Sequence, residues 1–371
     1  MVQTIIEQSY DNFKKYFTDL NIRKVFVVRG KKSFNTTGAD KFINNLLGGV
    51  EYNSFYDFNT NPQFSDLKKG IELFNSNKYD LIIAIGGGSV LDMAKLISVF
   101  ACQSKDIEDI VKGKSKIKDT KTPLIAIPTT AGTGAEATHF AVLYIDKTKY
   151  SVAYKSILPD AVYLSPEFTY SAGAYLTACT GLDAFCQAVE SAWSVNANDE
   201  SQDYSFKAID IIWNNLVKAV NRNDKTAKDK MLQAAYMAGK AINITKTTAP
   251  HAISYAFTSY YGIPHGHAVA LSLPFFFKYN YNVSDADCTD KRGAGDVKKR
   301  INKILNILNT DINAVEKILI QFFDNIGVNT NIEELIENFD KNLITNNINA
   351  ERLGNNPRKV TVQTITNLLK V

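Results

Sequence analysis

The feature that most constrains the fold is an apolar run that leads directly into a glycine triplet. Residues 81–85 (Leu-Ile-Ile-Ala-Ile) have the composition of a buried strand, and residues 90–97 have the apolar spacing of a helix. Glycines let backbone amides approach a phosphate closely, and a helix N-terminus adds a partial positive charge. The segment therefore predicts a strand, a helix and between them a phosphate-binding loop of Gly86, Gly87, Gly88 and Ser89. We expect Ser89 to cap the helix, with Asp92 completing the cap.

A second glycine-rich loop follows another apolar run, which favours a nucleotide site over an ordinary tight turn. Residues 124–128 (Leu-Ile-Ala-Ile-Pro) are typical of a buried strand, and the loop 129–136 behind them is rich in small and hydroxyl side chains. Its candidate ligand-binding residues are Thr129, Thr130 and Thr133. Loops that follow parallel strands place hydrogen-bond donors at one edge of the sheet, where open α/β folds bind nucleotides.

Histidine is scarce in this chain, and three of its four histidines lie close together. These are His251, His265 and His267, while Asp183 and Gln187 lie upstream, one helical turn apart on one face of a predicted helix. A carboxylate and two imidazoles suit a catalytic divalent metal that keeps an open position for substrate. We predict a metal site of Asp183, His251 and His265, with Gln187 as a weaker neutral ligand. Taken singly, each histidine would be an ordinary loop residue.

The pattern of the chain changes near residue 165. Before it, predicted strands at residues 24–28, 81–85, 124–127, 141–145 and 161–164 alternate with helical segments. After it, helical periodicity recurs at residues 203–220, 227–242, 299–308, 312–326 and 331–338. We therefore predict an α/β dinucleotide-binding domain over residues 1–165 and an all-α domain for metal and substrate over residues 166–371. The segments 284–299 and 341–350 are expected to be loops or frayed helix ends.

Composition excludes several classes of function. The net charge of +4 is small for 371 residues and the basic residues are dispersed, so we expect no nucleic-acid partner. No signal peptide and no apolar run of membrane-span length is present. Four cysteines without CxxC spacing indicate reduced thiols in a cytoplasmic protein. Cys186, between Asp183 and Gln187, is expected in the core and not on the metal.

Taken in order, these segments resemble the iron-containing, or group III, alcohol dehydrogenases over nearly the whole chain. The matching residues are Gly86 to Ser89 with Asp92 and Lys95, Pro128 with the loop 129–136, Thr180-Gly181 with Asp183-Ala184, His251, Pro264-His265-Gly266 and Asn356-Pro357-Arg358. The resemblance implies a dehydroquinate synthase-like architecture, NAD(P)-dependent alcohol dehydrogenase or aldehyde reductase activity, and often a homodimer. It implies cofactor contacts from Gly86, Gly87, Gly88, Ser89, Asp92, Thr129, Thr130, Thr133 and Lys149.

The end of the first long strand bears on which nicotinamide cofactor is used. Members of this family that prefer NAD(H) usually carry an acidic residue there for the ribose 2′-hydroxyl. This chain has Gly30, followed by Lys31, Lys32 and Ser33. Without a carboxylate to repel it, a 2′-phosphate can bind these side chains, which favours NADP(H), with NAD(H) as the alternative. A solvated basic turn would give the same residues.

Two residues depart from the pattern of the resembled family. Where iron-dependent members have a third histidine ligand, this chain has Gln187, and an amide oxygen is the poorer donor, so Fe(II), Zn(II) or a metal-free site stays open. Four residues after His251, where many members have a histidine that relays a proton, it has Tyr255. Tyr255 and His267 are the two candidates for the relay.

Glutamine at position 187 and the segment 246–251 resemble one branch of the family, the phosphonoacetaldehyde reductases, which implies a role in phosphonate metabolism. Such a substrate needs a cation near the metal, and Lys246 is the main candidate, with Lys155 and Arg358 as others. Three alternatives remain, namely a reductase of another small aldehyde or ketone, a dehydroquinate synthase-type cyclase and a non-catalytic nucleotide-binding scaffold. The cyclases normally carry glutamate after His-Gly, where this chain has His267.

Overall fold

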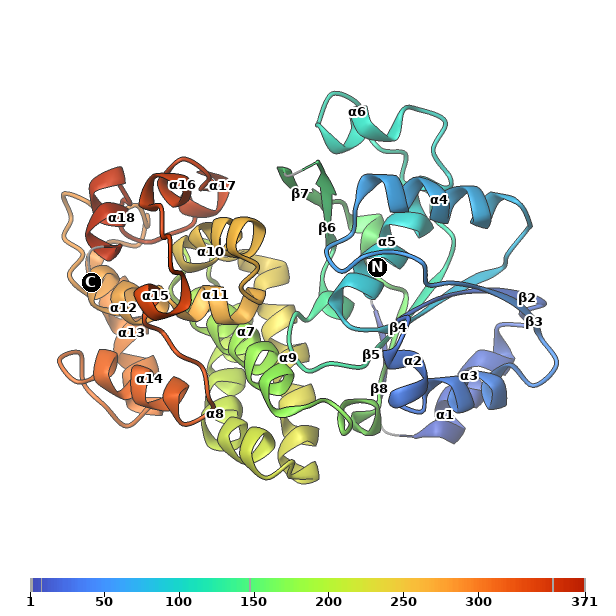
Figure 1. The fold of residues 1–371 in the computed structure, drawn as a ribbon, viewed down its shortest axis with the longest axis horizontal. Coiled ribbons are helices and arrows are strands. Elements are labelled where there is room, and N and C mark those ends of the chain that lie inside the picture. The colour runs from blue at the N-terminus through green and yellow to red at the C-terminus, as the bar shows by residue number, and fades with distance from the viewer. Residues whose placement is uncertain (1–2, 8, 147, 349, 370–371) are drawn as a thin grey trace. The chain divides into compact units, whose positions relative to one another are not determined.

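The chain forms two compact units, Met1–Ser171 and Ala172–Val371, in a computed structural model (Figure 1). The structure describes residues 3–7, 9–146, 148–348 and 350–369. The first unit mixes strands and helices, and the second is built of helices. The predicted fold class, an α/β domain followed by a helical domain, is confirmed.

The first unit is built on a six-stranded parallel sheet with the strand order β1-β8-β5-β4-β2-β3. The strands are β1 (Thr4–Glu7), β2 (Lys24–Arg29), β3 (Glu51–Phe55), β4 (Leu81–Gly86), β5 (Leu124–Pro128) and β8 (Ala161–Leu164). The two central strands β4 and β5 are buried along their whole length, as their apolar, β-branched composition predicts. Both therefore deliver their following loops to the same edge of the sheet.

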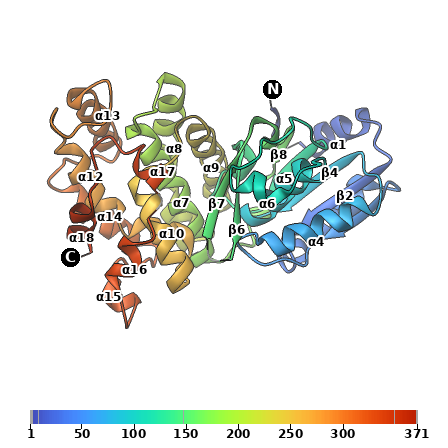
Figure 2. The same cartoon turned by 90° about the horizontal axis from the view of Figure 1, so that it is seen from above.

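Helices cover both faces of this sheet, because alternate residues of each strand point to opposite sides. On one face, α4 (Phe64–Asn75) and α5 (Gly88–Phe100) pack on a core that includes Phe26, Ile82 and Ala84. On the other, α1 (Tyr10–Asp19) and α3 (Ala39–Leu47) pack on Val25, Val27 and Ile83. Figure 2 shows α1 and α4 on opposite sides of the strands.

The remaining elements of this unit are short. They are α2 (Ser33–Thr36), α6 (Ile107–Val111), the turns η1 (Ala135–Ala137), η2 (Lys155–Ile157) and η3 (Pro166–Thr169), and the strands β6 (Phe140–Ile145) and β7 (Thr148–Ala153). The strand predicted at 141–145 exists, but it pairs antiparallel with β7 in a separate two-stranded sheet. Sequence periodicity missed β1, β3 and β7.

The second unit begins with three long helices, α7 (Ala174–Trp193), α8 (Asp199–Asn221) and α9 (Lys225–Thr245). Gly181 allows the close packing of α7 on α8, because a Cβ at this position would lie 2.3 Å from Leu216 Cδ1. The helices that follow are α10 (Ala249–Tyr261), α11 (His265–Ala270), α12 (Leu273–Tyr281), α13 (Ala294–Ile307), α14 (Val315–Asp324), α15 (Ile332–Leu335), α16 (Lys341–Thr345), α17 (Ala350–Leu353) and α18 (Val362–Leu368). Among the described residues, no helix has both the length and the apolarity to cross a bilayer.

Two segments expected to be loops contain more order than predicted. The asparagine-rich stretch 341–350 contains α16, which Asp340 caps by accepting from Asn342 N. The charged segment 284–299 contains the start of α13 and the buried side chain of Asp290. Within it, Arg292 forms ion pairs with Asp290 and Asp296, so the segment is held in place although most of its residues are exposed or half-buried.

Candidate metal and cofactor sites

Three predicted metal ligands converge in the second unit. Asp183 lies in the middle of α7, His251 in the first turn of α10 and His265 at the start of α11. Their ligand atoms all lie within 4.8 Å of one another. His251 Nε2 is 3.2 Å and His265 Nε2 is 4.0 Å from Asp183 Oδ1, and only His265 is partly exposed. One side of the cluster is therefore accessible, as an open coordination position requires.

The close approach of α11 to α7 depends on the glycine that follows His265. A Cβ on Gly266 would lie 1.9 Å from the carbonyl oxygen of Cys179 and 2.8 Å from Asp183 N. Neither backbone atom can move away without disturbing α7, so only glycine is compatible with this packing. The His-Gly pair thus combines a ligand with the contact that brings this ligand to Asp183.

Gln187 lies one turn after Asp183, and its Nε2 donates a hydrogen bond to Asp183 Oδ1 at 3.2 Å. Both side chains are buried. The predicted common face of α7 is therefore present. Cys186, between them, is fully buried in the core.

A buried carboxylate for which the sequence predicted no role contacts His251. Glu190, on α7, has no exposed surface, and its Oε1 contacts His251 Nδ1. Burial opposes the charged form of this imidazole, but Glu190 and Asp183 outweigh it and raise the pKa of His251 to about 10. The spacing along α7 could have indicated this residue, because position 190 shares a helical face with positions 183 and 187.

The two candidates for proton relay lie in different surroundings. Tyr255, on α10, is half-buried, and its ring stacks on His265 with centroids 5.9 Å apart. His267 is buried, with Nδ1 2.9 Å from Tyr175 Oη and Nε2 2.6 Å from the carbonyl oxygen of Asn329. Burial lowers the pKa of His267, although the bond to Asn329 opposes this shift.

Lys246, the predicted anion-binding residue, ends α9 in a strained backbone conformation. Its φ is 58° and ψ is −179°, a region that residues with a side chain rarely adopt. Its Nζ forms an ion pair with Glu351 on α17. Of the two other lysine and arginine candidates, Arg358 is bonded to Asp287 and to Tyr279 O, and Lys155 lies in the α/β unit.

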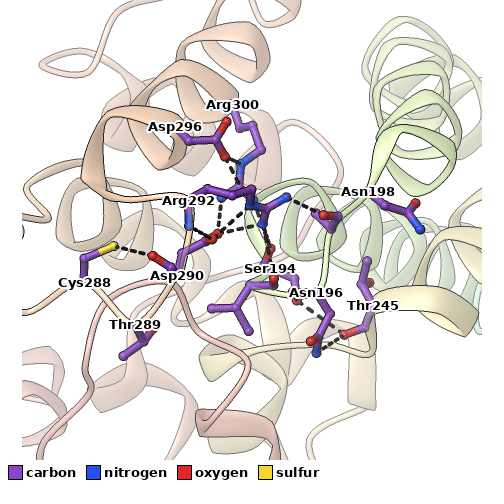
Figure 3. A network of polar contacts seen from close by, with 12 residues as sticks. Ser194, Asn196, Asn198, Thr245, Cys288, Thr289, Asp290, Arg292, Asp296 and Arg300 are labelled. Carbon is purple, nitrogen blue, oxygen red and sulfur yellow. Dashed lines mark hydrogen bonds and ion pairs between the residues drawn. The ribbon is translucent and has the colours of Figure 1, made fainter.

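The C-terminal end of α7 is held by Arg292, from the charged segment, and by Arg300, which directly follows that segment (Figure 3). Arg300 Nη1 donates to the carbonyl oxygens of Ala192 and Ser194 at 3.0 and 2.9 Å. Arg292 Nη2 donates to Ser194 O at 3.0 Å, and both guanidinium groups pair with Asp290. Cations at this end satisfy carbonyls that the helix leaves unpaired and oppose the negative end of its dipole.

The two predicted nucleotide loops of the α/β unit lie against each other. A Cβ on Gly88 would lie 2.7 Å from Thr133 Oγ1, and one on Gly87 would lie 3.4 Å from Thr130 Oγ1. A Cβ on Gly86 would collide with Val90 at 2.6 Å. Thr129, which starts the second loop, is buried and its N–H donates to Gly86 O at 2.9 Å. Glycine is thus required by packing at the strand end and between the loops.

The expected cap of α5 by Ser89 is wrong. Gly87 occupies the cap position, and Ser89 Oγ instead accepts from Asn61 N at 3.2 Å. Among the residues that the structure describes, no side chain caps this helix. Its first amides therefore remain suited to an anion.

Asp92 and Lys95 anchor the second loop and the hairpin behind it. Lys95 is fully buried and donates to Ala135 O at 2.8 Å, while Asp92 accepts from Val142 N at 2.9 Å. Burial raises the pKa of Asp92 against the charges of Lys95 and of Lys149, which lies on β7. Asp92 thus binds strand β6 of the hairpin, and Lys95 binds the end of the second loop.

The residues expected to select the cofactor follow β2. Lys31 and Lys32 are exposed, and Lys31 Nζ lies 3.2 Å from Asp57 Oδ1 in a solvent-exposed ion pair. A Cβ on Gly30 would lie 2.0 Å from Ser33 Oγ, so a side chain at position 30 would collide with this hydroxyl in its present rotamer. Position 30 therefore contributes no carboxylate of its own.

Comparison with known proteins agrees with this arrangement. The family model described as "Iron-containing alcohol dehydrogenase" matches residues 3–166, and the model of the C-terminal part of that family matches residues 177–371. The chain belongs to the iron-containing alcohol dehydrogenase family. The resemblance found in the sequence is confirmed.

Two sequence relatives and one solved structure illustrate the range of this family. Long-chain-alcohol dehydrogenase 1 of Geobacillus thermodenitrificans is 35% identical over 234 residues, which is 62% of this chain and 59% of that protein. Phosphonoacetaldehyde reductase of Streptomyces viridochromogenes is also 35% identical over 234 residues, 61% of this chain and 59% of that protein. These matches thus span less than two thirds of each relative. The structure of sulfoacetaldehyde reductase from Bifidobacterium kashiwanohense, in complex with NAD+, superimposes with a TM-score of 0.88 at 25% identity and covers 99% of this chain and 96% of that one.

The residues of this family member fit the groups that its family implies. One carboxylate and two imidazoles converge, and a further carboxylate contacts the outer nitrogen of His251, the arrangement that orients metal-binding histidines in proteins. In the α/β unit, the closely packed glycine loop and the start of α5 fit a pyrophosphate.

Proposed function

We propose that this protein is an NAD(P)H-dependent aldehyde reductase that converts phosphonoacetaldehyde to 2-hydroxyethylphosphonate at a divalent-metal site. The observation that carries the proposal is the convergence of Asp183, His251 and His265. These residues come from three different helices and lie far apart in the sequence. This donor set, with one accessible side, is what a catalytic metal with an open position needs.

Asp183, His251 and His265 would hold the metal, with Gln187 as a fourth, weaker donor. Both Fe(II) and Zn(II) suit one carboxylate and two imidazoles. When bound, the metal would polarise the aldehyde carbonyl as a Lewis acid while the nicotinamide supplies the hydride. The protein's own part is to align the ligands and to keep their surroundings dry, because Asp183 and His251 are buried.

The cofactor would be held by the α/β unit through the loops that begin at Gly86 and Thr129. We propose NADP(H) as the preferred form, because Gly30 contributes no carboxylate and Lys31 and Lys32 follow it. The ion pair between Lys31 and Asp57 is exposed and therefore weak, so Lys31 can turn to a 2′-phosphate at small cost.

Lys246 would bind the anionic group of the substrate. Its backbone is strained, which functional sites tolerate more often than other places, and its pair with Glu351 leaves the side chain half-buried. Two similar proteins are reductases of a two-carbon aldehyde that carries an anionic group. This group is a phosphonate in one and a sulfonate in the other. We therefore place the substrate in this chemical class.

The proton for the product alkoxide would come through Tyr255, the aromatic side chain that stacks on His265. His267 is the alternative, but using it would require breaking one of its bonds to Tyr175 or Asn329.

The test is steady-state reduction of phosphonoacetaldehyde, sulfoacetaldehyde and propionaldehyde with NADPH by wild type and Lys246→Met. We expect Lys246→Met to raise KM for phosphonoacetaldehyde about tenfold or more and to leave propionaldehyde reduction unchanged, because one ion contact contributes ~1.4 kcal/mol or more. Lys240→Met, within the helix α9 that Lys246 follows, is the matched control. If wild type reduces propionaldehyde as well as phosphonoacetaldehyde, the substrate class is wrong.

A further inference from the structure

Glu190 is a fully buried carboxylate with no place among the metal ligands or the cofactor loops. It lies seven residues after Asp183 on α7, and therefore on the same face as Asp183 and Gln187. A buried carboxylate is costly unless it is paired and hydrogen-bonded. Its pairing partner in this structure is His251, a predicted ligand from a different helix.

The second oxygen of Glu190 binds the start of α10. Oε2 accepts from Thr248 N at 2.7 Å and from Thr248 Oγ1 at 2.8 Å, and His251 N lies at 3.4 Å. Thr248 is the cap residue of α10, and among the described residues no side chain of α10 itself performs this capping. A carboxylate on α7 thus caps α10 and satisfies amides at its positive end.

These contacts join the helix that carries Asp183 to the helix that carries His251. Thr248 Oγ1 also accepts from Trp193 Nε1 at 3.0 Å, so the cap is tied to α7 at a second point. With Nδ1 held against Glu190, the imidazole directs Nε2 toward Asp183 Oδ1, 3.2 Å away. Ring rotation of His251 would break the Glu190 contact.

We propose that Glu190 is a positioning residue of the metal site, which fixes the ring orientation of His251 so that Nε2 faces Asp183 and His265. The inference rests on the proposed metal-dependent function and adds to it a residue that touches neither metal nor substrate. Loss of a hydrogen-bond partner of a ligating histidine typically weakens metal binding about 10–100-fold, even when every ligand remains.

The experiment measures metal binding directly in the full-length protein. Zn(II) affinity of metal-free wild type, Glu190→Gln and Glu190→Asp is measured by competition with a chelating indicator, and Co(II) absorption spectra report the ligand geometry. We expect an affinity loss of about 10–100-fold and an altered Co(II) spectrum in both variants, with NADPH affinity unchanged. Glu190→Asp keeps the charge but is one methylene shorter, and it serves as the second variant should Glu190→Gln not fold.

Asp290→Asn is the matched control, because Asp290 is also a buried carboxylate of the second unit that pairs with arginines and with none of the three ligands. It should lower the melting temperature and leave Zn(II) affinity unchanged. Wild-type Zn(II) affinity and Co(II) spectra in both folded Glu190 variants would overturn the positioning role alone. If wild type binds neither metal, the proposed metal site itself fails, and the role of Glu190 with it.

Discussion

Gln187 is the residue that distinguishes the donor set of this protein from one with three imidazoles. Its amide lies one helical turn from Asp183 and is already within hydrogen-bonding distance of it. We expect Gln187→His to tighten Zn(II) binding about tenfold or more, ~1.4 kcal/mol, because imidazole is a better donor than an amide oxygen. Competition with a chelating indicator measures the change. Unaltered affinity would show that side chain 187 does not reach the metal.

Individual residues also show what the sequence could and could not predict. Asp183, His251 and His265 were predicted together because few residue types bind metals and histidine is scarce here, and the structure brings them together. Glu190 was not assigned, although its spacing placed it on the right face. Its partners lie 58 and 61 residues away, and helical periodicity gives no information about contacts at that distance.

At the scale of elements, the arginine pair of Figure 3 holds the carbonyls of Ala192 and Ser194, at the C-terminal end of α7. Arg300→Met removes two donors to helix carbonyls and one buried partner of Asp290. We expect a loss of about 3 kcal/mol in the free energy of unfolding, measured by urea denaturation. Lys207→Met breaks an exposed pair with Asp203 and should cost only about 0.3–0.5 kcal/mol. Equal losses in both variants would contradict this account.

The same network predicts a pH dependence of stability. Burial opposes ionisation of Asp290, but hydrogen bonds from Arg292 and the charge of Arg300 outweigh it and hold its pKa below the ordinary value of 3.8. A carboxyl whose folded pKa is depressed stabilises the fold above its unfolded pKa and loses this effect as pH falls through the folded value. The stability difference between wild type and Asp290→Asn should therefore be constant near neutral pH and shrink below about pH 4. A difference that persists or grows with acid would contradict the assignment.

Elements with a strong apolar period were predicted, and those without one were missed. Strands β4 and β5 are buried throughout and appear as continuous apolar runs. Strand β3 (Glu-Tyr-Asn-Ser-Phe) is an edge strand and mostly polar, and β1 has only four residues, so neither stands out from a loop. The strand at 141–145 was predicted correctly, but composition could not tell a separate hairpin from the main sheet.

At the scale of the whole molecule, the residues proposed for cofactor selection lie in the first unit and those proposed for metal binding lie in the second. Gly30→Asp should lower the preference for NADPH over NADH about tenfold or more, ~1.4 kcal/mol, because the new carboxylate repels a 2′-phosphate and can accept from a ribose hydroxyl. Ser33 must change rotamer to admit the Cβ. Zn(II) affinity should stay unchanged. Ratios of kcat/KM for the two cofactors measure the effect, and an unchanged ratio would mean that the end of β2 does not select the cofactor.

The central claim is that Asp183, His251 and His265 hold a metal on which aldehyde reduction depends. The most direct measurement strips the protein with chelator, reloads it with Fe(II) or Zn(II), and follows NADPH oxidation with phosphonoacetaldehyde. We expect activity to disappear on stripping and to return with metal, and His265→Ala to lose nearly all turnover while it still binds NADPH. Full activity in the stripped protein, or in His265→Ala, would contradict the claim.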